Sequence, residues 1–234
     1  GVNMTLRKQW AVCAVALLLP AVLAGCVSDA DIMPKAAAAS YAPMSDPRYG
    51  AVSDGAYTVA AVPGGDLKTR YMRQLVDDPT GQPAGTVVVD PKNRFLYLVQ
   101  EGGKALRYGV GVGKEGMAWS GTANVAMKRE WPRWTPTKDM IAREPDKYVK
   151  WARGMEGGTQ NPLGARALYL FKNGKDTLYR IHGTNEPWSI GQAMSSGCIR
   201  MMNQDVIDLY RRVPSGAKVV VLPAGGAETA ASGG

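Results

Sequence analysis

The feature that most constrains this fold is a series of short β-prone segments between residues 86 and 181, with turn residues between them. Asp90-Pro91-Lys92-Asn93 separates the first two segments, and Asn173-Gly174, a strong hairpin turn, separates a later pair. We expect strands at 86–90, 94–100, 105–112, 123–129, 166–172, 177–181 and 219–221. Short strands at regular intervals predict a mainly β fold, a β-sandwich or barrel.

A few short helices are expected beside the strands. Residues 138–143 and 146–152 follow two prolines that interrupt the strand pattern, and 71–76 is a further short candidate. The clearest helix follows Asn203, which is expected to cap it, and ends before Pro214. Its apolar residues recur at helical spacing at Val206, Ile207, Leu209, Tyr210 and Val213. This helix is expected to pack rather than to carry chemistry.

The first 25 residues have the pattern of a secretory signal peptide. Basic Arg7 and Lys8 precede an apolar stretch and then small residues, and the stretch is too short for a permanent membrane span. The ending Leu-Ala-Gly-Cys resembles a bacterial lipobox, in which Cys26 is the acylated first residue of the mature protein. The alternative is an ordinary cleavable signal. The prediction is therefore an exported protein, periplasmic and lipid-anchored to a bacterial membrane through Cys26.

Residues 26–81 contain many Ala, Pro, Gly and Asp residues and show no sustained apolar period. This composition predicts a flexible tether that would let an anchored domain search some distance from the membrane. The catalytic domain is then expected at 82–223, and 224–234 is expected to be a disordered tail.

The formal net charge of +8 favours an anionic partner. Nucleic acid is an improbable partner for an exported chain, and the sequence has no zinc-finger, RNP or helix-turn-helix pattern. Cell-wall carboxylates or anionic lipid headgroups fit better, although a surplus of this size also serves solubility alone.

One histidine and one cysteine are the candidate catalytic pair. His182 is the sole histidine, and Cys198 follows it by 16 residues, after a loop rich in Gly and Ser. Cys13 would leave with the signal peptide and Cys26 would be blocked by lipid, so Cys198 remains as a single thiol in an oxidising compartment. A thiol with a pKa near ~8.5 needs a neighbouring base to become a nucleophile at neutral pH.

Two alternatives to a catalytic pair are a residue without chemistry, which stays open on the residues alone, and a zinc site, which is disfavoured. A lone His or Cys is often a packed or surface residue without chemistry. A zinc site needs three or four protein ligands, which one Cys and one His do not supply, so no metal is predicted.

The surrounding residues resemble a known family. His-Gly-Thr at 182–184, followed by Ser-Ser-Gly-Cys-Ile-Arg at 195–200, resembles the signature of the L,D-transpeptidase catalytic domain (YkuD-type). Blocks at 109–121, 130–136 and 161–170 are also similar to that family. Many members have Ser-His-Gly-Cys where this chain has Ser-Ser-Gly-Cys, which leaves His182 as the only possible imidazole base.

The resemblance implies a role for each matching residue. Cys198 is the nucleophile, His182 the general base and acid, and the Gly183 carbonyl orients the imidazole. Backbone amides of Ser196, Gly197 and Cys198 form the oxyanion hole. Arg200 is a candidate for binding a substrate carboxylate, with an ion pair to Asp205 or Asp208 as the structural alternative. Trp188 is a further candidate substrate contact.

The implied activity is peptidoglycan 3→3 cross-linking without cofactor. Cys198 cleaves the bond before the terminal D-alanine of a tetrapeptide stem, forms a thioester, and passes the acyl group to an amine of another stem. The thioester could instead be passed to an outer-membrane protein amine, or to water as in a carboxypeptidase or amidase. A third alternative is a non-catalytic wall-binding lipoprotein. The thioester route predicts that carbapenems acylate Cys198.

Overall fold

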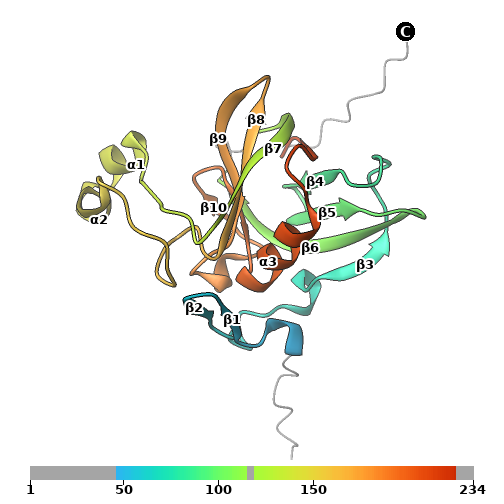
Figure 1. Cartoon of the computed structure of the whole chain (residues 1–234), viewed down its shortest axis with the longest axis horizontal. Coiled ribbons are helices and arrows are strands. Elements are labelled where there is room, and N and C mark those ends of the chain that lie inside the picture. Colours follow the sequence, from blue (N-terminus) through green and yellow to red (C-terminus); the bar gives the residue numbers. More distant parts are fainter. Residues whose placement is uncertain (1–45, 115–118, 225–234) are drawn as a thin grey trace, which may run out of the picture. The chain divides into compact units, whose positions relative to one another are not determined.

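The computed structural model describes residues 46–114 and 119–224. Within these residues the chain forms a mainly β domain, with ten strands joined in one sheet (Figure 1). The predicted signal peptide, the acylation site Cys26 and the tail from residue 225 lie outside the described residues. These three predictions therefore stay predictions.

The main sheet closes on itself. Its strands are β3 (Gln74–Asp77), β4 (Val87–Asp90), β5 (Phe95–Val99), β6 (Lys104–Gly113), β7 (Gly121–Glu130), β8 (Arg166–Lys172), β9 (Lys175–His182), β10 (Ala193–Ser195), β11 (Ile199–Met201) and β12 (Lys218–Val221). The order β10-β6-β11-β9-β8-β7-β12-β4-β5 is completed by a second pairing of β5 with β6, and β3 pairs with β6 outside this path. The predicted barrel-like β fold is thus confirmed.

Strand alternation explains why two apolar clusters form around the same strands. On β4, Val87 and Val89 belong to the central core, whereas Val88 faces a second cluster with Phe95 and Tyr97 of β5. Successive side chains on a strand point to opposite faces, so a run of consecutive apolar residues is buried on both sides. The second cluster is covered by Tyr71 and Val76, among others.

Helix α3 (Asn203–Arg212) packs its apolar residues against the sheet (Figure 1). Val206 and Leu209 are fully buried in the central core, as the helical spacing predicts. The predicted cap is wrong. Met202 is the N-cap residue, and the Asn203 side chain instead bonds Ala165 and Thr184, which flank the site described below.

The segment between β7 and β8 carries the predicted short helices. These are α1 (Lys138–Arg143), α2 (Pro145–Tyr148) and the 3-10 turn η4 (Val149–Trp151). Thr137 caps α1 through its hydroxyl oxygen, which accepts from the Met140 amide. The two arms of the segment meet where Trp134 and Met155 exchange backbone hydrogen bonds. The helices lie away from the sheet in Figure 1.

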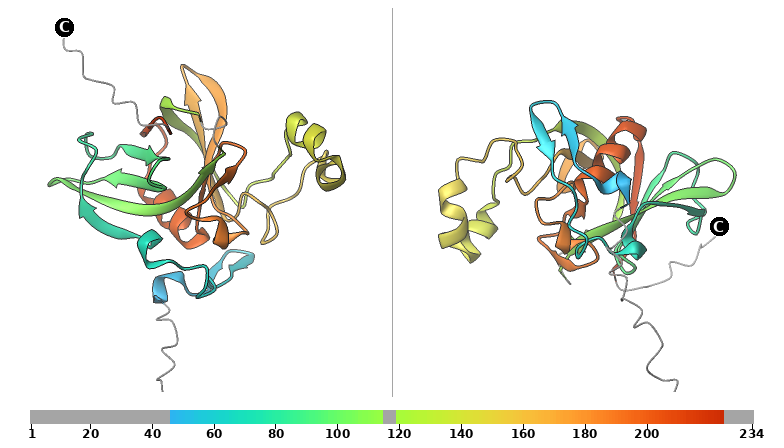
Figure 2. Two further views of the ribbon diagram at one scale, coloured as in Figure 1. Left: turned by 180° about the vertical axis from the view of Figure 1, so that it is seen from behind. Right: turned by 90° about the horizontal axis from the view of Figure 1, so that it is seen from below.

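The tether predicted for residues 26–81 is wrong from residue 46 onward. The chain there forms η2 (Pro47–Tyr49), β1 (Val52–Asp54), β2 (Tyr57–Val59), η3 (Thr69–Tyr71) and β3, and we call residues 46–77 the N-terminal segment. The helix expected at 71–76 is also wrong, because Gln74–Asp77 pairs with β6 as a strand. Figure 2 shows the β1–β2 hairpin beside α3.

Specific contacts from distant residues hold the N-terminal segment. The Gln204 amide of α3 donates to the carbonyls of Gly50 and Ala60, and Tyr49 donates its hydroxyl to Asp205. Asp54 accepts two hydrogen bonds from Arg166 of β8. No helix in the described part of the chain is long and apolar enough to cross a membrane.

Candidate active site

The two candidate catalytic residues come from neighbouring parallel strands. β9 ends at His182, and β11 begins one residue after Cys198. In the β9–β11 pairing, Ile199 lies opposite Ile181 and Arg200 lies opposite His182. The same register brings Cys198 beside Arg180. His182 and Cys198 line one pocket of about 290 Å³.

His182 is held as a neutral base. The side chain is 4% exposed, and Nδ1 lies 2.5 Å from the Gly183 carbonyl oxygen. A carbonyl oxygen only accepts, so this contact assigns the proton to Nδ1 and leaves Nε2 as the acceptor. Burial and the charges of Arg200 and Arg180 together lower the pKa of His182 to about 4, against the opposing effect of the Gly183 carbonyl. The imidazole is therefore neutral at physiological pH.

The half-buried thiol of Cys198 lies in a field made by charged residues of β9. Burial raises the pKa of the thiol, whereas the Arg180 backbone amide and the charges of Arg180 and Arg200 lower it. Arg180 is itself fixed by Asp176, with both guanidinium–carboxylate contacts at 2.7 Å, and lies over the ring of Tyr169. The Asp176 carboxylate opposes the two arginines by raising the thiol pKa.

We therefore expect opposite effects from removing the two charges of the Arg180–Asp176 pair. Arg180→Gln should raise the pH midpoint for alkylation of Cys198, because one cation near the thiolate is lost. Asp176→Asn should lower that midpoint, because the anion that opposes the cation is lost. Iodoacetamide labelling as a function of pH, read at the Cys198 peptide by mass spectrometry, measures both. Shifts in the same direction would mean that the two substitutions act by disturbing the fold.

The loop before Cys198 is fixed by Ser195. Its hydroxyl donates to the Cys198 carbonyl at 2.6 Å and accepts from the Gly197 amide at 3.2 Å. Gly197 has φ of 122°, a conformation that favours glycine. The predicted oxyanion hole consists of the amides of Ser196, Gly197 and Cys198. The Gly197 amide already donates to Ser195, so it is not available to an oxyanion in this structure. The amides of Ser196 and Cys198 are the better candidates.

Asn203 connects the base to the body of the domain. Its carboxamide accepts from the Ala165 amide at 2.9 Å and donates to the Thr184 carbonyl at 2.8 Å. A Cβ on Gly183 would overlap the Asn203 oxygen, so the absence of a side chain at 183 lets Asn203 approach. This contact fixes the backbone whose carbonyl orients His182.

The segment carrying α1 and α2 supplies one wall of the active-site pocket. Its lining residues include Trp134, Met140, Lys147, Tyr148, Lys150 and Trp151. Arg200 also lines the pocket, and its guanidinium pairs with Glu186 at 2.8 Å. The alternative ion pair of Arg200 with Asp205 or Asp208 is wrong, because those two carboxylates face Arg73.

Trp188 does not join the other predicted site residues. It lies on the 3-10 turn η5 (Pro187–Ser189), is 48% exposed, and is not among the residues lining the active-site pocket. Trp134 and Trp151 supply the aromatic surface there instead.

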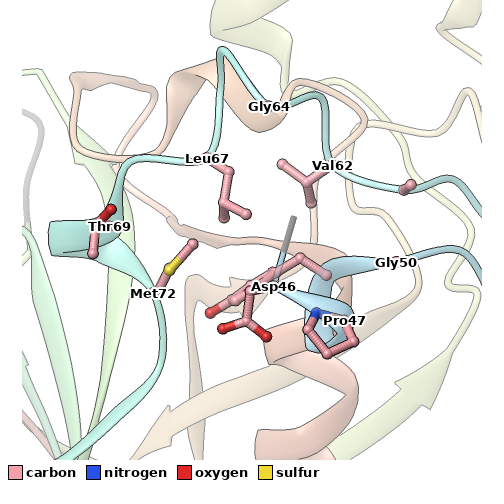
Figure 3. Close-up of a pocket in the computed structure, with 10 residues that line it drawn as sticks. Asp46, Pro47, Gly50, Val62, Gly64, Leu67, Thr69 and Met72 are labelled. Carbon is pink, nitrogen blue, oxygen red and sulfur yellow. The ribbon is translucent and has the colours of Figure 1, made fainter. Parts of the chain in front are cut away.

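A larger cavity of about 690 Å³ lies elsewhere, on the N-terminal segment (Figure 3). Its lining is mostly apolar, with Val62, Leu67 and Met72, and its acidic residue Asp46 is paired with Arg48. Its described lining contains no Cys, His or Lys. The described residues also contain no group of three or more His, Cys, Asp or Glu side chains placed to bind a metal.

The family model described as the L,D-transpeptidase catalytic domain, YkuD, matches residues 84–221. The chain belongs to the L,D-transpeptidase catalytic domain family. It is 32% identical over 162 residues to the probable L,D-transpeptidase YbiS of Escherichia coli, which is 68% of this chain and 50% of that protein. A putative L,D-transpeptidase of Fuscovulum blasticum is 34% identical over 147 residues, covering 62% of this chain and 72% of that protein.

The L,D-transpeptidase domain thus spans about half the length of the Escherichia coli relative. A solved structure from Brucella melitensis, described as a probable carnitine operon oxidoreductase, is 55% identical and covers 65% of this chain and 94% of that one, with a TM-score of 0.46. An L,D-transpeptidase from Mycobacterium smegmatis is 18% identical over 59% of this chain and 58% of that one, with a TM-score of 0.43.

Sequence reasoning missed three groups in this candidate site. Arg180 precedes His182 by two residues, and strand alternation is the signal that could have placed both side chains on one face. Ser195 and Asn203 carried no comparable signal, because their roles depend on backbone groups of other segments. Asn203 was predicted to cap a helix, and its true partners are 19 and 38 residues away in the chain.

Proposed function

We propose that this chain is a peptidoglycan L,D-transpeptidase in which Cys198 is the nucleophile and His182 is the general base and acid. The observation that carries the proposal is the β9–β11 register, which supports a neutral imidazole and a thiol lining one pocket. The Nδ1 contact with Gly183 leaves Nε2 free to take the thiol proton.

In the first half-reaction the Cys198 sulfur attacks the carbonyl carbon of the third residue of a tetrapeptide stem. A C–S bond forms as the C–N bond to the terminal D-alanine breaks. His182 passes the thiol proton to the departing amine, so the products are free D-alanine and a thioester. The backbone amides of Ser196 and Cys198 are the candidate donors to the oxyanion, and one such donor is worth about 10²–10³ in rate.

In the second half-reaction an amine of another stem attacks the thioester carbonyl. The C–S bond breaks, a C–N bond forms, and the proton lost by the amine returns to the thiolate through His182. The result is a 3→3 cross-link. The same thioester would serve an outer-membrane protein amine or water as acceptor, and acceptor choice would lie in the walls of the pocket. Lys147 and Lys150 in one wall favour a substrate that carries carboxylates.

We also propose that the mature protein is periplasmic and lipid-anchored through Cys26. The signal-peptide pattern and the Leu-Ala-Gly-Cys ending support this.

The deciding experiment incubates the chain without its predicted signal peptide with disaccharide-tetrapeptide and analyses the products by mass spectrometry. Cys198→Ala serves as the inactive partner. We expect a dimer lacking one D-alanine that forms only with Cys198 present. Loss of D-alanine without a dimer would mean that the thioester forms but that its acceptor is a protein amine or water. If both proteins leave the substrate unreacted and no carbapenem adduct forms on Cys198, the remaining hypothesis is a non-catalytic wall-binding lipoprotein.

A further inference from the structure

A second groove lies next to the active-site pocket and shares Asn185 with it. We call it the side groove, and its volume is about 540 Å³. One wall is formed by residues 58–63 and 66 of the N-terminal segment, and the other by residues 159–160 and 185 and 187. The start of α3 forms the floor. The matched family region begins at residue 84, so the first wall lies outside it.

The walls of the side groove are held in place. Gln204 on the floor is buried and donates to the carbonyls of Gly50 and Ala60, which fixes the N-terminal wall to α3. On the opposite side, the Asn185 carboxamide donates to the Gln160 carbonyl at 3.1 Å and so joins the two segments of that wall. The groove is therefore a built feature rather than a gap beside a loose chain.

The chemistry of the lining favours a neutral ligand rich in hydroxyl and amide groups. The side chains of Thr58, Thr159 and Gln160 make no hydrogen bond within residues 46–114 and 119–224, and all three residues are exposed. Apolar surface is supplied by Trp131, Pro63, Val62 and Pro187. Asp66 alone is charged among the described lining residues, whereas the active-site pocket contains lysines, Arg200 and Glu186. A carboxylate-bearing peptide therefore fits the active-site pocket better than the side groove.

We propose that the side groove binds the N-acetylated disaccharide that carries the stem peptide of the acyl donor. This inference rests on the proposed function for the identity of the donor. Pyranose rings combine apolar faces with hydroxyl and acetamido edges, which match the exposed Thr and Gln side chains and the Pro, Val and Trp surface. Three stem residues between the sugar and the scissile bond span about 10 Å when extended, so a disaccharide would lie beside the active-site pocket.

The test compares two substrates that differ only in the sugar. Thr159→Trp places a large side chain in the side groove from one wall, and Thr58→Trp does so from the other. Each should raise the KM for disaccharide-tetrapeptide at least tenfold and leave kcat/KM for the free tetrapeptide within twofold. Thr122→Trp, at an exposed threonine of β7 that lines neither the side groove nor the active-site pocket, is the matched control and should change neither value. Equal losses on both substrates, or no loss on either, would overturn the inference.

A binding measurement separates this inference from the proposed function. The Cys198→Ala protein is titrated with an N-acetylglucosamine oligosaccharide, and binding is followed by calorimetry. The same titration is made with a double variant that also carries Thr159→Trp. Binding that Thr159→Trp abolishes would support the saccharide site even if the protein transferred no acyl group. Absence of binding, or binding that Thr159→Trp and Thr58→Trp leave unchanged, would refute the saccharide site even if the transpeptidase activity were established.

Discussion

Replacing His182 with glutamine should slow acylation of Cys198 by about 10²–10⁴-fold at pH 7, because the thiol then has no base to take its proton. The thiol pKa is raised by burial, so the spontaneous thiolate fraction at this pH is small. Acylation by a carbapenem, followed by intact-mass spectrometry, measures the rate directly. Because the imidazole is neutral in the folded protein, its removal leaves no unpaired charge, and the thermal unfolding midpoint should fall little.

The pH dependence distinguishes a lost base from a damaged pocket. The acylation rate of His182→Gln should approach that of the wild type as pH rises toward the thiol pKa, because hydroxide generates the thiolate without His182. In the wild type, the neutral imidazole is present at every pH well above about 4, so no rate step near pH 6.5 is expected. A deficit that stays constant up to pH 10 would contradict the role of His182 as base.

The candidate catalytic pair and the fold class could be predicted from sequence because both depend on local patterns. Alternation within 94–100 and the Asn173-Gly174 turn are read from adjacent residues, and β5, β8 and β9 lie within a few residues of the predicted strands. His182 and Cys198 stood out by their rarity. The short strands β10 and β11 were not predicted, because three residues in a Gly- and Ser-rich loop carry no period.

The N-terminal segment shows why the remaining features could not be predicted. Its composition is that of a linker, and nothing near Asp54 or Tyr49 in the chain indicates order. Their partners, Arg166 and Asp205, lie 112 and 156 residues away. Order in such a segment comes from a few specific polar contacts with a domain that is already folded, and single-sequence periodicity does not report those contacts.

The electrostatics of the site also depend on tertiary placement. A histidine beside a reactive cysteine can form an ion pair of thiolate and imidazolium. In the structure, burial and two arginines disfavour the imidazolium, while the same arginines favour the thiolate. The resting pair is therefore a neutral imidazole and a thiol, and in the proposed mechanism proton transfer accompanies attack on the substrate. Only the register of β9 against β11 brings Arg180 and Arg200 beside the pair.

Replacing Asp54 with alanine should destabilise the domain by about 3 kcal/mol, the lower end of the range for removing one partner of a buried ion pair. Arg166 is 5% exposed, and Asp54 accepts from both of its terminal nitrogens and from the Trp131 indole. Without Asp54, the guanidinium is left with Glu130 at 3.9 Å, a more distant and more exposed carboxylate. Thermal unfolding should shift down by roughly 6–12 °C.

Asp77→Ala is the matched control, because Asp77 belongs to the same N-terminal segment and also pairs with a cation, Lys104, but at the surface. Exposed pairs contribute little to stability, so its unfolding midpoint should stay close to that of the wild type. Hydrogen bonds from Arg166, together with its charge, lower the pKa of Asp54, so the stabilisation is present above pH ~4 and is lost as pH falls below it. The difference in thermal unfolding midpoint between the wild type and Asp54→Ala should therefore become smaller at acidic pH. An Asp54→Ala protein as stable as the control at pH 7 would mean that the Arg166–Asp54 pair does not anchor residues 46–77, and the wall of the side groove would then be held by the Tyr49 and Gln204 contacts instead.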